Sequence, residues 1–349
     1  MHIFRSLIRA SLRVFAPLLG LSLMGFLLFR TGAGTVWRQI QTVGWGLGLI
    51  IVLGGLSQLI KTWAWRQAIT YDIRELSWSR SFVAQLVSDG LGQLGVAGKL
   101  IGEGVRISSL DSAVPLASAI SAGAIDGALH SFTAIMVTVL GITATLQVAP
   151  LPARWRMYAM LVTAVLITCA ILPTVAVASG WPLIGNAIRA IGRLPRLRNW
   201  ISDKQPIVDS AEHNLLTFHR KAPGSFWANL ILNLLWHGLA VLEVYIILRF
   251  MGARIALVGA FVVEGLTKVI NLVGALNPGN LGTYEGGNML IAKTFGVTGT
   301  AGLTLALCRR ARTIFWAGVG AMCLIAMKRP GQTKKSGDEG GSEGSTVAA

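Results

Sequence analysis

The stretch Asn277-Pro-Gly-Asn-Leu-Gly-Thr-Tyr-Glu-Gly-Gly287 interrupts an apolar part of the chain, and residues 256–275 before it are almost entirely compatible with a membrane helix. Pro278 has no backbone N–H to donate, and the four glycines of the stretch weaken the continuation of a helix. Non-helical backbone at membrane depth persists only where protein or a water-filled cavity satisfies its polar groups. Because Glu285 lies in this interruption, the stretch predicts a binding or transport site.

The composition places the chain among membrane proteins. Of its 349 residues, 53% are hydrophobic and 13% are charged, whereas soluble domains carry about 25% charged residues. The apolar runs are long enough for helices that cross a bilayer about 30 Å thick. They lie near residues 14–30, 43–65, 114–147, 157–179, 226–250, 256–275 and 300–327. We therefore expect an all-α polytopic membrane protein, in which the Gly-rich segment 79–110 is not a simple span.

The net charge of +16 does not indicate nucleic-acid binding, because the basic residues cluster between the apolar runs as the positive-inside rule predicts. The three cysteines lie far apart within apolar segments and match no metal-binding spacing, so we expect them to be packing residues. No Ser-His-Asp order, HExxH motif or P-loop occurs. The sequence therefore predicts no catalytic residue, no metal, no cofactor and no enzymatic activity.

The basic residues also predict an orientation in a bacterial inner membrane. Arg5, Arg9 and Arg13 place the N-terminus in the cytoplasm. The basic connection 181–224 should be cytoplasmic and amphipathic, and the tail 328–349 disordered and cytoplasmic. Seven spans would put the two termini on opposite sides of the membrane. We therefore expect about eight crossings, with a Gly-broken segment that crosses or re-enters.

A second motif resembles the first. Leu94-Gly-Val-Ala-Gly-Lys-Leu-Ile-Gly-Glu-Gly104 has, like the stretch Leu276–Gly287, a glycine cluster, then a glycine shortly before a single Glu, then glycine. Matched interruptions in the two parts of a chain point to a transporter-like site at the interface of a repeat. Similar glycine content alone is the alternative explanation. The interrupted-helix motifs comprise Gly98, Gly102, Asn277, Pro278, Gly279 and Gly282.

The spacing of charges after each motif supports an internal repeat. Asp126 follows Glu103 by 23 residues, and Arg309 follows Glu285 by 24 residues, each inside the next apolar run. We therefore predict two pseudo-repeated halves, near residues 14–180 and 225–327, joined by the basic connection. Together they form a transmembrane domain that spans residues 1–327.

These motifs resemble the flippase-like transmembrane domain of lysylphosphatidylglycerol synthase, a family that includes many stand-alone membrane proteins. Gly98-Lys-Leu-Ile-Gly-Glu-Gly-Val-Arg106 is similar to the family's Gly-Arg-Leu-Gly-Glu-x-x-Arg, and Pro278-Gly-Asn-Leu-Gly-Thr-Tyr-Glu285 is similar to its Pro-x-x-x-Gly-x-x-Glu. The first motif departs from the family pattern, because Ala97 replaces a proline and one extra residue precedes Glu103. The resemblance extends over about residues 10–327.

The resemblance implies lipid translocation or a related lipid role. The chain ends after its last apolar run, so we expect no soluble aminoacyl-transferase domain and no lysine transfer. Some relatives are associated with hopanoid or polyprenyl-linked glycan pathways, which leaves several lipids open as substrates. The expected partners are membrane lipids that bear a phosphate, with a second copy of the chain or pathway enzymes as further partners.

The candidate substrate-binding residues are charged side chains in or near the apolar runs. Arg309 and Arg312 share a helix face and suit a phosphate, but they can equally pair with carboxylates or extend to the interface. Asp126 lies on one face with Ser118, Ala122 and His130 and either lines the site or forms a packing seam. The full set comprises Lys99, Glu103, Arg106, Asp126, Glu285, Arg309, Arg310 and Arg312.

Two other charged pairs have simpler interpretations. Glu264 and Lys268 are four residues apart and are expected to pair within one helix. His237, six residues before Glu243, is expected to be a hydrogen-bonded packing residue rather than a proton carrier. The predicted function is the movement of an anionic lipid or a lipid-linked intermediate between leaflets. The alternatives are a lipid-modifying enzyme that uses Glu103 and Asp126, and an ion-coupled transporter of a small solute.

Overall fold

The computed structural model describes residues 41, 43–69, 76–93, 96–110, 114–148, 151–191, 205–274, 280 and 282–326. Within these ranges the chain is helical and contains no β-strand, which confirms the predicted all-α fold. The helices run, in chain order, over Gly46–Ala68 (α3), Trp78–Gly92 (α4), Val96–Ser109 (α5), Leu116–Val148 (α6), Ala153–Ser179 (α7), Leu183–Ile191 (α8), Gln205–Lys221 (α10), Pro223–Phe250 (α11), Leu257–Val273 (α12), Thr283–Thr294 (α13) and Gly299–Ala326 (α14).

The long helices correspond to the apolar runs of the sequence. Among the described residues, α3, α6, α7 and α11 are long and apolar enough to cross a membrane. Helix α14 has 28 residues, the same length as α11, but it carries three arginines near its middle. The expected span at 14–30 and the tail 328–349 lie outside the described residues, as do Asn277, Pro278 and Gly279. The number of crossings therefore stays a prediction.

Several helix ends have a clear local cause. Helix α7 ends at Gly180, whose φ of 68° is a left-handed conformation that glycine adopts at little cost. Helix α11 begins with Pro223, whose missing N–H would have no helical partner at that position in any case. Helix α13 follows Gly282, which has a φ of 77°. These residues determine where the chain turns between helices.

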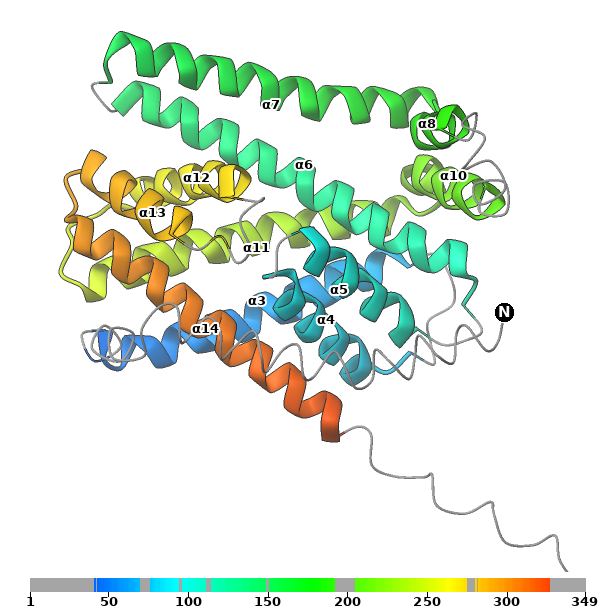
Figure 1. The fold of residues 1–349 in the computed structure, drawn as a ribbon, viewed down its shortest axis with the longest axis horizontal. Helices are drawn as coiled ribbons and strands as arrows, with labels where there is room; N and C mark the ends of the chain where they lie inside the picture. The colour runs from blue at the N-terminus through cyan, green and yellow to red at the C-terminus, as the bar shows by residue number, and fades with distance from the viewer. Residues whose placement is uncertain are drawn as a thin grey trace, which may run out of the picture.

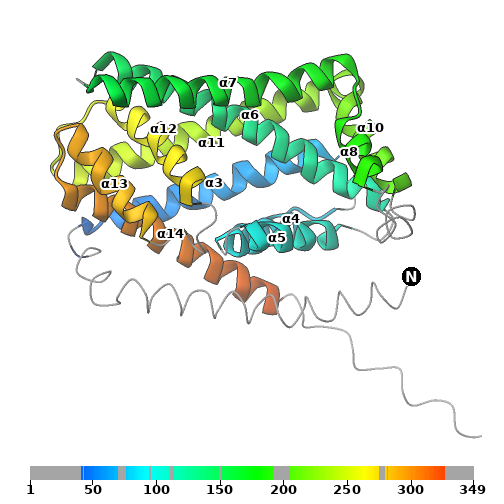
Figure 2. The ribbon, with the colours of Figure 1, turned by 45° about the horizontal axis from the view of Figure 1, so that its top comes forward.

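The order of helices occurs twice along the chain. A long helix (α3 or α11) is followed by two shorter helices (α4–α5 or α12–α13) and then by another long helix (α6 or α14). We refer to α3–α6 as the first half and to α11–α14 as the second half, so α7 lies outside the repeated order although the predicted first half extended to residue 180. Helices α3 and α11 pack side by side. The pair α12–α13 lies at one end of the molecule, whereas the pair α4–α5 lies nearer its middle (Figures 1 and 2).

Each pair of short helices packs on a long helix of the other half. Helix α4 contacts α14, and α12 contacts α6. Glycine makes both contacts close: a Cβ on Gly90 would lie 2.9 Å from the Cβ of Ala317, and a Cβ on Gly141 would lie 3.0 Å from the Cα of Gly265. The two halves are thus joined by closely packed small residues, as membrane helix interfaces commonly are.

The first interruption falls earlier in the chain than the motif predicted. The segment 79–110, which did not fit a simple span, forms α4 and α5, and the helix is interrupted after Gly92. Gly98 and Gly102 were expected at the interruption, but both lie inside α5. A Cβ on Gly102 would lie 2.7 Å from the backbone oxygen of Ser88 in α4, so this glycine permits close packing of the two helices instead.

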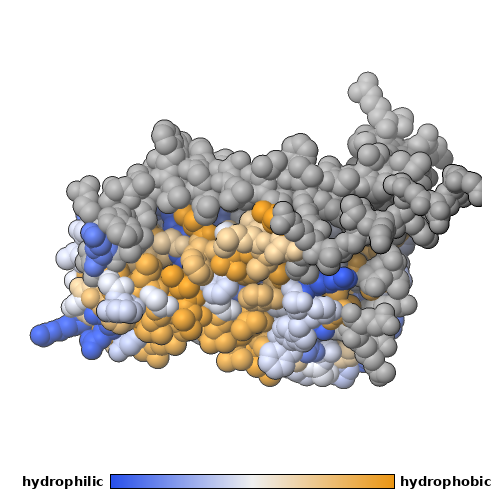
Figure 3. Space-filling model, turned by 90° about the horizontal axis from the view of Figure 1, so that it is seen from below, coloured by the Kyte–Doolittle hydropathy of each residue, from blue (hydrophilic) through white to orange (hydrophobic). Residues whose placement is uncertain are grey.

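The outer surface is apolar over the middle of the molecule. Figure 3 shows a broad hydrophobic band across one face, with hydrophilic residues toward both ends. Helix α7 is the most exposed of the candidate spans, since only 6% of its most apolar window is buried by the rest of the chain. It packs mainly along α6. Such an apolar exterior fits a molecule surrounded by lipid hydrocarbon.

The connection between the halves is helical in its described parts. It forms α8 and α10, which contact each other at one end of the bundle (Figure 1). The carboxylate of Glu212 accepts a hydrogen bond of 2.7 Å from the backbone N–H of Gly185. Arg189 lies 3.0 Å from Asp209. These contacts hold two short helices together beside the membrane-spanning bundle.

Candidate functional site

Arg106 is the centre of a charged cluster in the first half. Its guanidinium lies 2.6 Å from Glu103 on the same helix and 2.7 Å from Asp126 on α6. It also stacks over the ring of Trp65 in α3, at 4.6 Å from the ring centroid. The Arg106 side chain is only 8% exposed, so one buried cation holds two carboxylates and fixes α5 against α3 and α6.

Two asparagines extend this cluster toward the second half. The amide of Asn229 in α11 donates to Asp126 at 3.2 Å and to the backbone oxygen of Ala64 in α3 at 2.6 Å. Asn233 donates to the side-chain oxygen of Asn229 at 2.8 Å, and its own oxygen lies 2.9 Å from Nδ1 of His130. A row of hydrogen bonds therefore runs through the interior from Asp126 to His130.

Arg309 is the centre of the charged cluster in the second half. Its side chain is 9% exposed, and it lies 2.7 Å from Glu264 of α12 and 3.2 Å from Glu243 of α11. It also donates to the backbone oxygen of Ala240 at 2.8 Å. Lys268 lies 2.9 Å from Glu264, which confirms the pair expected within one helix. Arg312, on the same face of α14, lies 2.7 Å from Glu243.

The second motif forms its own contact at the start of α13. Glu285 accepts a hydrogen bond of 2.8 Å from the backbone N–H of Gly282, so its carboxylate caps the helix that follows the interruption. The guanidinium of Arg310 in α14 pairs with the other oxygen of Glu285. Arg310 also donates to the backbone oxygen of Asn280 at 3.2 Å. Glu285 thus joins the turn, α13 and α14.

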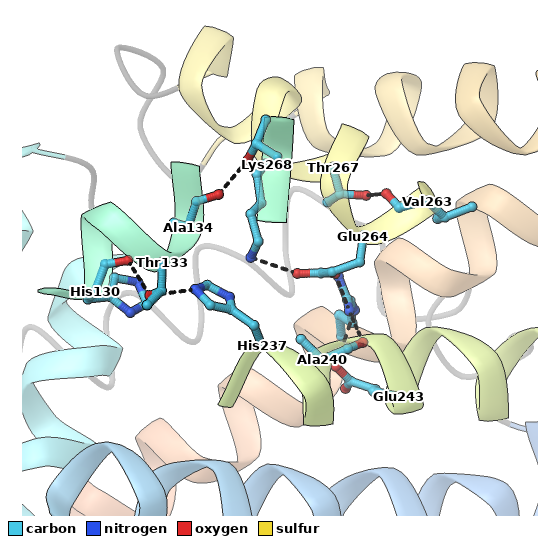
Figure 4. Close-up of polar contacts among 12 residues, drawn as sticks. His130, Thr133, Ala134, His237, Ala240, Glu243, Val263, Glu264, Thr267 and Lys268 are labelled. Atoms are coloured by element: carbon cyan, nitrogen blue, oxygen red, sulfur yellow. Dashed lines mark hydrogen bonds and ion pairs between the residues drawn. The ribbon is translucent and has the colours of Figure 1, made fainter. Parts of the chain in front are cut away.

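Aromatic and imidazole rings lie between the two charged clusters. Trp236 of α11 makes edge contacts with His130 and His237, whose rings stack on each other with centroids 5.4 Å apart. Nε2 of His237 lies 3.2 Å from the hydroxyl of Thr133. Figure 4 shows how His237, Lys268 and Glu264 face one another from neighbouring helices. His237 is buried and hydrogen-bonded, in agreement with its expected packing role.

The charges in the described part of the chain are unevenly divided between the clusters. In the first cluster Arg106 faces two carboxylates. In the second cluster three cations share the two carboxylates Glu243 and Glu264. The three are Lys268, Arg309 and Arg312. The first cluster therefore carries one excess negative charge and the second one excess positive charge.

The predicted residues fall into three groups. Arg106, Glu103 and Asp126 meet in the first half, Arg309 and Arg312 meet at Glu243, and Arg310 meets Glu285. Lys99 is exposed on α5. For Arg309 and Arg312, pairing with Glu103, Asp126 or Glu285 was the alternative to phosphate binding. Both do pair with carboxylates, but their partners among the described residues are Glu243 and Glu264.

Sequence reasoning missed several residues of this interior. Glu243 received no role as an arginine partner, and Asn229, Lys61 and Trp236 received no site role. Their common signal is a polar or amphipathic side chain inside a long apolar run, where its desolvation is costly unless a partner is present. Among the described residues, no three His, Cys, Asp or Glu side chains gather in a way that could hold a metal ion.

The fold and this charged interior define a class: a multi-pass, all-α membrane protein in which the same order of helices occurs twice. A family described as lysylphosphatidylglycerol synthase TM region matches residues 13–320, and the chain belongs to that family. A comparison with curated proteins and a comparison with solved structures each gave no match. The protein is therefore a membrane protein of a lipid-related family, in agreement with the resemblance carried by its two motifs.

Proposed function

We propose that the protein moves an anionic, phosphate-bearing lipid between the two leaflets of a bacterial inner membrane. The observation that carries the proposal is the continuous polar interior, which both halves line and which an apolar exterior surrounds. From the Arg106 cluster it runs through Asn229, Asn233 and His130 to Trp236. From Trp236 it continues through Lys268 to Glu264 and Arg309. A structural core alone gains little from so many ionised groups, because burying each charge costs free energy.

The proposed mechanism needs no covalent step. A lipid headgroup that passes through hydrocarbon loses its hydration, and polar walls replace part of that hydration while the acyl tails stay in the bilayer. The second cluster, with its excess positive charge, is suited to the phosphate. The carboxylate of Glu285 would hold the turn before α13, so that polar backbone can persist at the edge of the pathway.

The orientation is part of the proposal. The end of the bundle with α8 and α10 also receives the C-terminal end of α3 (Figure 1). The connection 181–224, which includes α8 and α10, carries seven Lys and Arg residues, and Arg66 lies in the last turn of α3. Because cytoplasmic loops are enriched in Lys and Arg, we assign this end to the cytoplasm. The basic surface of α8 and α10 would then face the anionic headgroups of the inner leaflet.

The experiment is lipid scrambling in reconstituted vesicles. Purified protein is incorporated into vesicles that contain a fluorescent phosphatidylglycerol, and dithionite bleaches the lipid of the outer leaflet only. The unmodified protein should make nearly all of the fluorescence accessible, and Glu285→Gln should slow this about tenfold or more, because it removes the charge that Arg310 binds. Asp209→Asn is the matched control, since it neutralises the carboxylate of an exposed ion pair between α8 and α10.

The same vesicles separate this function from the two alternatives. If the protein modifies lipids, mass spectrometry of the recovered lipids will show a product of changed mass. If it carries a soluble solute, uptake will occur in vesicles while the fluorescent lipid stays in its leaflet. Scrambling at the rate of protein-free vesicles by the unmodified protein would contradict the proposal.

A further inference from the structure

Two lysines from different halves meet at one indole ring. The ammonium of Lys61 in α3 lies 4.7 Å from the centroid of the Trp236 ring, and that of Lys268 in α12 lies 5.3 Å from it. The two ammonium groups are therefore no farther apart than the sum of these distances. A cation within about 6 Å of an indole centroid is attracted by the ring's quadrupole, so Trp236 can hold both cations in place.

These lysines are more accessible than the arginines at the cluster centres. The side chains of Lys61 and Lys268 are 23% and 13% exposed, compared with 8% for Arg106 and 9% for Arg309. Within the described ranges each ammonium makes one ion pair, at 2.6 Å to Asp89 and 2.9 Å to Glu264. An ammonium has three N–H donors, so each lysine can bind a second acceptor without leaving its carboxylate.

The charge around Trp236 favours an anion. The described ion pairs that include these two lysines join four cations to three carboxylates, namely Lys61, Lys268, Arg309 and Arg312 with Asp89, Glu243 and Glu264. One positive charge is left without a counter-charge among them. The opposite excess charge, at Glu103 and Asp126, is separated from these lysines by Asn229 and Asn233, so a ligand with a single negative charge would be favoured beside the lysines. A phosphodiester carries one such charge and accepts several hydrogen bonds.

We propose that Lys61 and Lys268, brought together at Trp236, form the position that binds the phosphodiester of the transported lipid. This inference rests on the proposed function and adds to it a specific contact. Each half supplies one lysine, so a bound phosphate bridges α3 and α12. Lysine suits this role as a compact, strongly charged donor, whereas the arginines form the fixed charge pairs around it.

Binding of a short-chain phosphatidylglycerol tests the site separately from transport. Dihexanoyl phosphatidylglycerol is titrated into detergent-purified protein by calorimetry, and dihexanoylglycerol, which lacks the phosphate, is titrated as the reference. Lys61→Gln and Lys268→Gln should each raise Kd about tenfold or more, since each removes a charged hydrogen-bond donor. The arginine variants Lys61→Arg and Lys268→Arg should stay within about threefold of the unmodified protein, because the charge remains.

Two controls distinguish binding from folding. Lys293→Gln removes an exposed lysine of α13 and should leave Kd unchanged. The double variant Lys61→Gln with Asp89→Asn removes both charges of one pair, which avoids an unpaired carboxylate in the fold. Its melting temperature should be close to that of the unmodified protein, and it should still bind phosphatidylglycerol about tenfold more weakly.

The outcomes separate the two proposals. Equal affinity of the Gln variants and the unmodified protein for phosphatidylglycerol would overturn the lysine site, even if the protein scrambles lipid. The lysine site would also be overturned if the unmodified protein bound the phosphate-free reference as tightly as it binds phosphatidylglycerol. It would likewise be overturned if the unmodified protein did not bind phosphatidylglycerol. If free glycerol 3-phosphate competes with the lipid, a phosphate ester without acyl chains suffices for binding. If glycerol 3-phosphate does not compete, the acyl chains are required for binding. Failure of scrambling with lysine-dependent binding intact would overturn the transport proposal alone.

Discussion

At the scale of single residues, the interior is a set of charges that depend on one another. Arg106 touches Glu103, Asp126 and the face of Trp65 at once, and its side chain is almost fully buried. Its two carboxylates are not equivalent. The Glu103 side chain is 38% exposed, whereas that of Asp126 is 14% exposed, so loss of Arg106 would leave Asp126 as the charge that water reaches least.

Arg106→Ala should therefore destabilise the protein strongly. Removal of one partner of a buried ion pair costs about 3–5 kcal/mol, because the remaining charge stays desolvated. Neutralising Asp126 at the same time, as Arg106→Ala with Asp126→Asn, should recover more than half of the loss, since the introduced amide would keep a hydrogen bond to Asn229. The measurement is the temperature at which detergent-purified protein loses its monodisperse peak. If Arg106→Ala and the unmodified protein lost this peak at the same temperature, the result would contradict this account.

The sequence reveals local contacts of the site but not its distant ones. Glu264 and Lys268 pair within one turn of spacing, and Glu285 caps the helix that begins just before it, so both contacts follow from short-range rules. Glu243 and Arg312 are 69 residues apart, and Asn229 and Asp126 are 103 residues apart. Only the packing of α11 against α14 and α6 creates such contacts, and no spacing in the sequence encodes that packing.

At the scale of helices, glycine positions decide how closely elements approach. The crossing of α6 and α12 has glycine on both sides, at Gly141 and Gly265, and a Cβ on either would lie 3.0 Å from the other's Cα. Glycine in a helix costs about 1 kcal/mol relative to alanine. Its presence at this crossing therefore has a packing reason that outweighs helix propensity.

Gly141→Ala and Gly127→Ala make a matched pair within α6. A Cβ on Gly127 would meet nothing within 4 Å, so Gly127→Ala should leave stability unchanged or raise it by up to about 1 kcal/mol. Gly141→Ala gains the same helix propensity but forces α6 and α12 apart. The net result should be a loss of stability of about 1–3 kcal/mol. Thermal melting of both variants in one detergent checks the difference. A stabilised Gly141→Ala would show that the crossing can widen freely.

The helices themselves were largely predictable, and the interruptions less so. Spans expected near 43–65, 114–147, 157–179, 226–250 and 300–327 correspond to α3, α6, α7, α11 and α14. Long apolar runs allow few alternatives in a membrane, because backbone hydrogen bonds must be satisfied within the helix. The first interruption was misplaced because Gly98 and Gly102 suggest a break by composition. Gly102 instead serves the contact with Ser88, which is visible only after α4 and α5 are packed.

At the scale of the whole molecule, the contacts divide the chain into two mechanical units. Every described ion pair outside the α8–α10 connection joins residues of the same half. Between the halves lie neutral contacts, such as the hydrogen bond of Trp316 to the backbone oxygen of Ile51 and the crossing of Gly141 with Gly265. Two further contacts between the halves involve one charged side chain each, from Asn229 to Asp126 and from Lys61 to the ring of Trp236, but neither is an ion pair. Separating an ion pair in a low-dielectric interior is costly, whereas small residues permit sliding. The halves can therefore shift against each other while their charge pairs stay intact.

A reversible cross-link between the halves tests whether lipid movement requires such a shift. Gly90 of α4 and Ala317 of α14 lie in different halves, and a Cβ on Gly90 would be 2.9 Å from that of Ala317. A disulfide needs about 3.8 Å between its Cβ atoms, so Gly90→Cys with Ala317→Cys should cross-link after a small separation of the helices. The background carries Cys169→Ser, Cys308→Ala and Cys323→Ala.

Oxidation of the double variant should slow lipid scrambling about tenfold or more, and a reductant should restore it, because the disulfide fixes α4 to α14. Each single-cysteine variant, treated with the same oxidant, controls for oxidation elsewhere. Mobility on a gel cannot report this intrachain bond directly, so the cross-linked fraction is measured by mass spectrometry of the digested protein. Full scrambling by a completely cross-linked sample would mean that lipid passes along a fixed polar interior. In that case the lipid would pass along the ion pairs without any relative movement of the halves.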